Sequence, residues 1–250
     1  MCVVAIKRPS RVALTAKRPL WHTFVNAILY TLESNMPNWC NNYLELEHDD
    51  PVMITRARKA FAEGKLLEEF CPVPASLHIV SGRVGSDEDA EQKKLEEDTE
   101  RNIKEHGYGN WYDYCVNEWG TKWDVGGDGY EASDTSPNAT SMAFDSAWAP
   151  PTGAMDKFMD LGFKVKLIYW ESGMCFCGIY DENGDDYMDY SDMSADEVEA
   201  NINSEVDECM CIVENLREWE EENSEDEENI DIDLDGGLSA INEQGQDENK

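Results

Sequence analysis

The sequence predicts an α+β protein in which an antiparallel sheet carries helices on one face. Two observations indicate this class. Segments that alternate apolar and polar residues, as half-buried strands do, are interleaved with segments that carry helix start and stop signals. The chain has 250 residues, of which 41% are hydrophobic and 10% aromatic, so it can build a core and is not disordered throughout.

The first predicted strand covers residues 39–47, where Leu44 and Leu46 alternate with a tyrosine and two glutamates, the period of a half-buried strand. A helix is expected directly after it, because Asp50 suits the N-cap, Pro51 the first helical position and Gly64 the stop. The two prolines within residues 70–74 then favour extended backbone, since each restricts the residue before it.

The middle of the chain is predicted to hold an insertion and a short aromatic helix. Residues 87–106 contain helical charge pairs but few apolar members, so we expect a solvated acidic helix there. Aromatic residues recur at three- and four-residue spacing over 108–119, and Gly120 ends that helix. Strands are expected at 121–125 and 141–148, joined by a loop rich in Gly, Asp, Ser and Pro.

The next elements complete the pattern. Pro150 and Pro151 open a helix, and alternation over 163–169 predicts a strand whose partner returns over 174–180. Residues 181–186 contain an Asn-Gly turn signal between strands. The order is strand, helix, strand, strand, helix, strand and an added hairpin strand. It predicts a ferredoxin-like split βαβ sandwich.

The ends of the chain differ from this core. Residues 1–35 carry five Lys and Arg against one Glu, and we interpret them as a basic N-terminal extension that precedes the biological start at Met36. The ferredoxin-like domain is assigned to residues 36–192 with its acidic insertion near 87–106. An amphipathic acidic helix is expected over 193–222.

The helix assignment rests on a capping box formed by Ser194 and Glu197, followed by apolar residues at steps of three and four. Residues 223–250 are expected to form a disordered acidic tail, because they are highly charged and poor in aromatic residues.

The acidity excludes several classes of function. The formal net charge is -34, and residues 181–250 hold 27 acidic against two basic side chains. Such a field repels nucleic acid phosphates and anionic membrane surfaces. No stretch offers the roughly 20 apolar residues that span a bilayer, and eight cysteines are too sparse for a disulfide scaffold. We therefore expect a cytoplasmic protein with no direct nucleic acid or membrane partner.

Six short blocks, taken together and in this order, resemble the YubB ferredoxin-like domain family. Members occur in bacteria, plasmids and phages, and their molecular function is not established, so the resemblance implies the fold and a bacteriophage or mobile-element context. The family's habit of beginning with Met-Pro-Asn-Trp-Cys supports Met36 as the start, while the acidic insertion and tail depart from its pattern. The blocks are Met36-Pro-Asn-Trp-Cys-Asn-Asn, Phe70-Cys-Pro-Val-Pro, Asn110-Trp-Tyr-Asp-Tyr, Trp119-Gly-Thr-Lys-Trp-Asp, Phe144-Asp-Ser-Ala-Trp-Ala-Pro-Pro and Glu171-Ser-Gly-Met-Cys-Phe-Cys-Gly.

A set of tryptophans with nearby charged residues forms the candidate binding site. The block over 119–123 is its most distinctive part, because two indoles, a lysine and a permissive glycine within five residues indicate a shaped loop. Aromatic residues at these spacings also occur in cores, so burial is the alternative interpretation. The candidate residues are Trp39, Trp119, Lys122, Trp123, Asp145, Trp148 and Glu171.

The sequence predicts no catalytic residue, cofactor or metal site. The spacing of the cysteines at 175 and 177, and at 209 and 211, is not that of a zinc or iron–sulfur motif, and the first pair is interpreted as thiols sharing one strand face. Residues 231–242 begin like a calcium loop but place Asn242 at the twelfth position, so a solvated tail is the preferred interpretation and weak calcium binding the alternative.

Three hypotheses about function follow. The leading one is a non-enzymatic accessory protein of a phage or mobile element that binds a basic host protein through its acidic surface. The alternative is a small-ligand module or enzyme that uses the Trp-rich loop at 119–123. A third, nucleic acid binding on the open sheet face, lacks the basic residues that it needs.

Overall fold

The computed structural model describes residues 38–86 and 88–223 of the chain. They form two compact units that meet in the sequence between Asp189 and Tyr190, and each unit is described by itself. The sequence predictions for the basic extension, the start at Met36 and the calcium-like loop at 231–242 lie outside the described residues.

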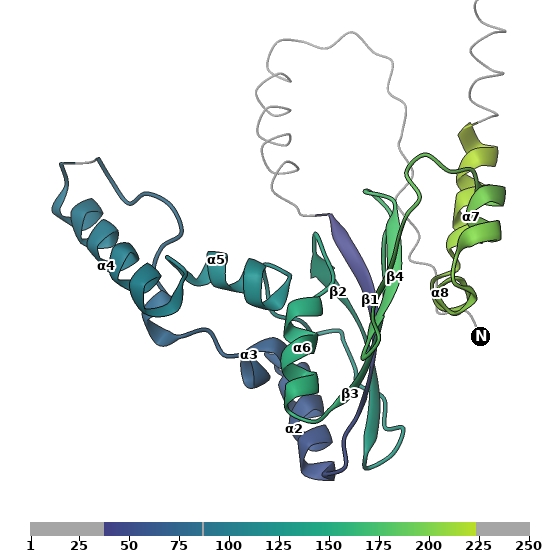
Figure 1. The fold of residues 1–250 in the computed structure, drawn as a ribbon, viewed down its shortest axis with the longest axis horizontal. Helices are drawn as coiled ribbons and strands as arrows, with labels where there is room; N and C mark the ends of the chain where they lie inside the picture. The colour runs from purple at the N-terminus through teal and green to yellow at the C-terminus, as the bar shows by residue number, and fades with distance from the viewer. Residues whose placement is uncertain (1–37, 87, 224–250) are drawn as a thin grey trace, which may run out of the picture. The chain divides into compact units, whose positions relative to one another are not determined.

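The first unit is built on a five-stranded sheet in which every neighbouring pair is antiparallel. The order is β2-β1-β3-β4-β5, so β1 lies between β2 and β3, which α6 connects. This is the split βαβ arrangement, and it confirms the predicted α+β fold, a ferredoxin-like sandwich with an added hairpin strand (Figure 1). The strands are β1 (Trp39–Glu47), β2 (Ala139–Ala147), β3 (Lys164–Glu171), β4 (Phe176–Asp181) and β5 (Gly184–Asp189).

Three helices cover one face of this sheet: α2 (Pro51–Ala62), α3 (Leu66–Phe70) and α6 (Thr152–Asp160). The start of α2 is as predicted, because the Asp50 side chain accepts a hydrogen bond from the Val52 amide and Pro51 follows it. Alternate residues of the strands face these helices and make the core. Its largest fully buried side chains include Tyr169, Phe61, Phe158, Leu44 and Met142.

The predicted strand at 121–125 is wrong, because this segment is a loop in the structure. The Thr121 hydroxyl, rather than a backbone ladder, meets the end of β2: it donates to the Ala147 carbonyl and accepts from the Ala147 amide, both at 3.0 Å. Farther along, Ala132 forms an isolated bridge with Met142 of β2. The outer edge of β2 is thus covered by this loop and not by a paired strand.

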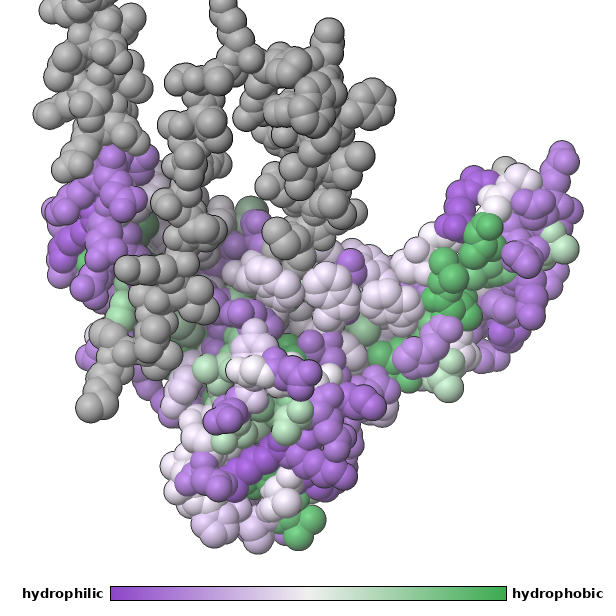
Figure 2. Space-filling view, turned by 180° about the vertical axis from the view of Figure 1, so that it is seen from behind, coloured by the Kyte–Doolittle hydropathy of each residue, from purple (hydrophilic) through white to green (hydrophobic). Residues whose placement is uncertain are grey.

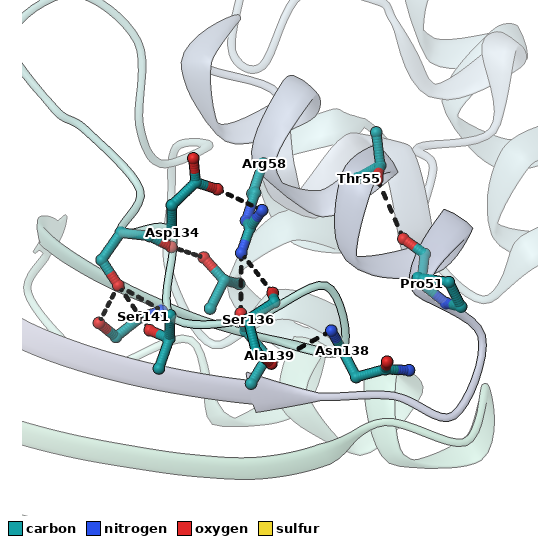
Figure 3. A network of polar contacts seen from close by, with 11 residues as sticks. Pro51, Thr55, Arg58, Asp134, Ser136, Asn138, Ala139 and Ser141 are labelled. Carbon is teal, nitrogen blue, oxygen red and sulfur yellow. Dashed lines mark hydrogen bonds and ion pairs between the residues drawn. The ribbon is translucent and has the colours of Figure 1, made fainter.

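Arg58 of α2 fastens this loop to the helical layer (Figure 3). Its guanidinium donates to the carbonyls of Ser136 and Ala139, each at 2.8 Å, and forms an ion pair with Asp134. One side chain therefore ties α2, the loop and the first residue of β2 together.

The insertion extends away from the sheet (Figure 1). It contains η1 (Ala75–Leu77) and α4 (Ala90–His106), followed by α5 (Trp111–Tyr114) and a π-helical turn, η2 (Cys115–Trp119). Asn102 of α4 is buried, and its side-chain amide donates to the carbonyls of Ser76 and Gly109, at 2.9 and 3.2 Å. Figure 2 shows hydrophobic surface on this projecting part, where Val80, Val84 and Ile103 are exposed.

The second unit has short helices where the sequence predicts one amphipathic helix over 193–222. These are α7 (Ala195–Asn201), α8 (Ser204–Met210) and a helical segment over 212–223. The predicted capping box of Ser194 and Glu197 is present. α7 ends at Asn201, and the Asn203 side chain then caps α8 by accepting from the Glu205 amide. α8 in turn ends at Met210, before Cys211, which is left-handed with φ 56°. Apolar residues at steps of three and four predict a shared apolar helix face. They do not show whether the helix is continuous.

Among residues 38–86 and 88–223, none of the helices has both the length and the apolar character that a membrane crossing requires.

Candidate functional site

Three tryptophans from separate segments meet near one end of the sheet: Trp39 begins β1, Trp123 lies in the loop after η2, and Trp148 directly follows β2. We call these three residues the Trp cluster. The ring centroids of Trp39 and Trp123 are 6.0 Å apart, and those of Trp123 and Trp148, which stack, are 6.5 Å apart. The side chains are 46%, 38% and 41% exposed in chain order. Such large rings contribute apolar surface to solvent instead of to the core.

Lys122 places its ammonium group over the faces of two of these rings, Trp123 and Trp148. Its Nζ atom lies 4.5 Å from the ring centroid of Trp123 and 5.1 Å from that of Trp148, with Tyr112 at 5.7 Å. These distances are in the cation–π range. None of the described carboxylates forms an ion pair with Lys122, and within this part of the chain its ammonium group contacts aromatic rings.

The backbone that presents the cluster is held in specific conformations. Gly120 ends η2 with φ 88°, and a Cβ atom there would lie 3.0 Å from the Pro150 carbonyl oxygen, so the position favours glycine. Trp148 is itself left-handed, with φ 68°, and its amide donates to the Asn38 carbonyl at 2.8 Å. A bulky residue in this region is strained, and such strain concentrates at functional sites.

Trp119 belongs to the core rather than to the Trp cluster. It is 4% exposed, and its indole Nε1 donates to the Cys71 carbonyl at 2.8 Å. A buried indole needs a hydrogen-bond acceptor, and Cys71 supplies it. The sequence left burial in the core as the alternative interpretation of these aromatic residues. For Trp119 that alternative is the one the structure has.

The two predicted carboxylates have separate structural tasks. Asp145 accepts from the Asn41 side-chain amide at 2.6 Å and from the Tyr130 hydroxyl at 3.0 Å. Glu171 is buried and accepts from the backbone amide of Met174, which closes the turn between β3 and β4. The structure thus brings together four of the seven predicted residues, Trp39, Lys122, Trp123 and Trp148.

Two residues near the site were not singled out by the sequence. Tyr112 joins Lys122 from α5; in the sequence it appeared as a member of the aromatic helix and of the block that begins at Asn110. Asp124 turns inward and accepts from the amides of Leu67, Glu68 and Val125 at 2.8 to 2.9 Å, which anchors the loop to the start of α3. Burial raises the pKa of Asp124 above its usual value, while these hydrogen bonds oppose the shift.

The cysteines provide little nucleophilic chemistry. Cys177 is buried on β4, but Cys175 lies in the preceding turn with φ 57°, so the prediction that the two share a strand face is wrong. Burial raises the pKa of Cys71 and Cys175, and that of Cys115 to about 12, which favours the protonated thiol at neutral pH. Within 38–86 and 88–223, no group of three or more His, Cys, Asp or Glu is arranged to hold a metal ion.

Comparisons with known proteins assign this chain to no family. No family model matches the chain, and no curated protein matches it. One solved structure is similar, the crystal structure of a protein api92 from Yersinia pseudotuberculosis, described with the family model DUF1281. It is 12% identical with a TM-score of 0.33, over 62% of this chain and 98% of that chain. A likeness at this level says nothing about function.

Proposed function

We propose that this chain is a non-enzymatic binding protein that acts on a basic host protein, with the Trp cluster at the centre of the contact and the acidic surface guiding the approach. The observation that carries the proposal is the convergence of three partly exposed indoles from three separate segments, with Lys122 over the faces of two of them, Trp123 and Trp148. Membership of the YubB family and a role in a phage or mobile element form part of the same proposal.

Interface energetics support this assignment. Tryptophan is enriched among the few residues that dominate protein–protein binding, because it buries a large rigid surface at a low cost in side-chain entropy. In a folded core these rings would be covered, yet each is more than one third exposed. A partner that covers them would remove apolar area from water and gain the corresponding free energy.

The charge supports a basic partner over other macromolecules. A net charge of -34 attracts cationic proteins over long range and speeds their association, and this attraction weakens as salt screens it. The same charge opposes nucleic acid and anionic membranes.

The test is co-purification from the native host with the full-length chain, followed by mass spectrometry. We expect a basic protein whose recovery falls at high salt and is lost when Trp123→Ala and Trp148→Ala are combined. Trp219→Ala is the matched control, because Trp219 lies in the second unit and is 61% exposed. A list of captured proteins that is the same for the double variant and the wild type would contradict the proposal.

A small-ligand module is the second candidate, and the cation over the rings is the observation that favours it. Lys122 could meet an anionic group while a flat part of the ligand stacks on an exposed indole. A thermal-shift screen of metabolites tests this candidate: we expect a stabilising ligand whose effect disappears in Lys122→Ala.

A further inference from the structure

We propose that the exposed indole faces of the Trp cluster bind an arginine or lysine side chain of the partner, and that Lys122 occupies the faces of Trp123 and Trp148 in the free protein as a resident cation. This inference rests on the proposed function and names the chemistry of its contact. Lys122 would then be an internal competitor of the partner rather than a contributor to its binding.

The position of Lys122 shows that the ring faces accept a cation. Its Nζ lies within 5.1 Å of two indole centroids and 5.7 Å of the Tyr112 centroid. The faces of Trp, Tyr and Phe carry negative potential, and indole gives the strongest attraction. Arginine suits these faces especially well, because its planar guanidinium stacks on aromatic rings and is weakly hydrated.

The cluster also leaves surface available for a second side chain. The ring centroid of Trp123 is 6.0 Å from that of Trp39 and 6.5 Å from that of Trp148, and all three side chains remain partly exposed. A partner's cation that approaches these rings is attracted by the chain as a whole but repelled by the Lys122 ammonium at close range.

Because of this arrangement, removing the charge of Lys122 should change the binding affinity in opposite directions for a cationic and an anionic ligand. If the site takes a cation, removing the charge of Lys122 frees the ring faces and removes a local repulsion, so binding becomes tighter. If the site takes an anion, the same change removes its counter-charge, so binding becomes weaker. The sign therefore separates the two classes of ligand that the cluster could hold.

The experiment uses the full chain and a defined probe, an acetylated and amidated peptide of four Gly-Arg repeats. Binding is followed by NMR through the indole N–H signals, assigned with single Trp→Phe variants. We expect the signals of Trp123, Trp148 and Trp39 to shift, while that of the buried Trp119 stays in place.

Affinity is then compared between Lys122→Met and a control with the same change in net charge, Lys164→Met. Lys164 is an exposed lysine of β3 whose ammonium is 3.6 Å from Glu47. We expect Lys122→Met to bind the peptide about two- to fivefold more tightly than Lys164→Met, the factor that corresponds to one cation–π contact. Lys122→Arg, which keeps the resident cation, should bind like the wild type.

The inference is overturned if Lys122→Met binds the peptide no more tightly than Lys164→Met, or if the peptide leaves the indole signals of the Trp cluster unchanged. It is also overturned if a nucleoside monophosphate shifts these signals in the wild type and loses affinity in Lys122→Met. An unchanged Trp119 signal in each variant confirms that the fold is intact.

The inference and the proposed function fail in different ways. If the peptide binds as expected but no basic protein co-purifies from the host, the chemistry of the site stands and the proposed function fails. If a basic protein co-purifies and is lost with the cluster double variant, but its affinity is the same for the wild type and Lys122→Met, the function stands and the inference fails.

Discussion

Trp119 and Trp123 lie four residues apart in one sequence block, yet the fold uses them in opposite ways. Trp119 ends η2, is buried, and donates to a backbone carbonyl of the core. Trp123 is partly exposed. Within the described part of the chain, its ring contacts Trp39 and Trp148 of the Trp cluster and the Lys122 ammonium group. The difference shows that residue type and sequence spacing do not decide whether a tryptophan is buried or exposed. The position of the backbone turn decides it.

The turn between them separates the two environments. The left-handed Gly120 ends the helical segment, and the Thr121 hydroxyl then fixes the chain to the end of β2. From there Lys122 and Trp123 extend toward Trp148, while Asp124 returns to the core side and caps α3. Core and surface residues thus alternate within five positions, and substitutions can test each assignment.

The largest effect should come from the buried indole. We expect Trp119→Ala to lower the free energy of unfolding by about 3–5 kcal/mol, because it leaves a cavity and an unpaired Cys71 carbonyl. Trp123→Ala should lower it by about 0.5–1 kcal/mol, the range of an aromatic pair near the surface. Urea denaturation of both variants measures the difference. Equal losses would show that the two environments have been misassigned.

An intermediate effect is expected at Asp124. Removing its carboxylate leaves the Leu67 and Glu68 amides at the start of α3 without their acceptor, so Asp124→Ala should cost about 1–3 kcal/mol in unfolding free energy. Asp128→Ala, at an exposed position of the same loop, should change stability by about 0.5 kcal/mol or less. If the two variants unfold at the same urea concentration, Asp124 is not an anchor.

The strain at Trp148 predicts a smaller difference between two truncations. Both Trp148→Gly and Trp148→Ala remove the ring, but only glycine adopts φ 68° without steric cost. The glycine variant should therefore be more stable than the alanine variant by about 1 kcal/mol, as thermal unfolding can measure. An alanine variant of equal or greater stability would show that the left-handed backbone is unstrained.

The sequence predicted the fold where local signals agreed with tertiary packing. Alternation gave β1 and β3, and the signals at Asp50 and Pro51 gave the start of α2. The expected strand at 121–125 failed because a side-chain hydroxyl and inward-facing Asp124 replaced the ladder, which an alternating pattern cannot reveal.

The candidate site was predicted only in part, for a related reason. Trp39 and Trp148 come to the same end of the sheet because Trp39 pairs with Ala147 across β1 and β2, and strand register of this kind is not readable from either segment alone. The same limit explains why Trp119 and Glu171 were grouped with the cluster and why Tyr112 was not. Residue type in the sequence identified the candidate site residues. Their pairing in three dimensions decided which of them belong to the Trp cluster.

The smallest effect concerns Lys122 and connects stability to binding. Among residues 38–86 and 88–223 its ammonium group contacts ring faces, so Lys122→Met should lower the free energy of unfolding by about 0.5–1 kcal/mol, while Lys122→Arg preserves the cation and changes it little. The exposed ion pair of Lys164 with Glu47 should contribute less, so Lys164→Met is again the control. If Lys122 is a resident cation, its removal makes the free protein less stable and a cationic probe bind more tightly, because the same ring faces serve both interactions. A variant that loses both stability and affinity for the cation would instead show that Lys122 supports the architecture of the site.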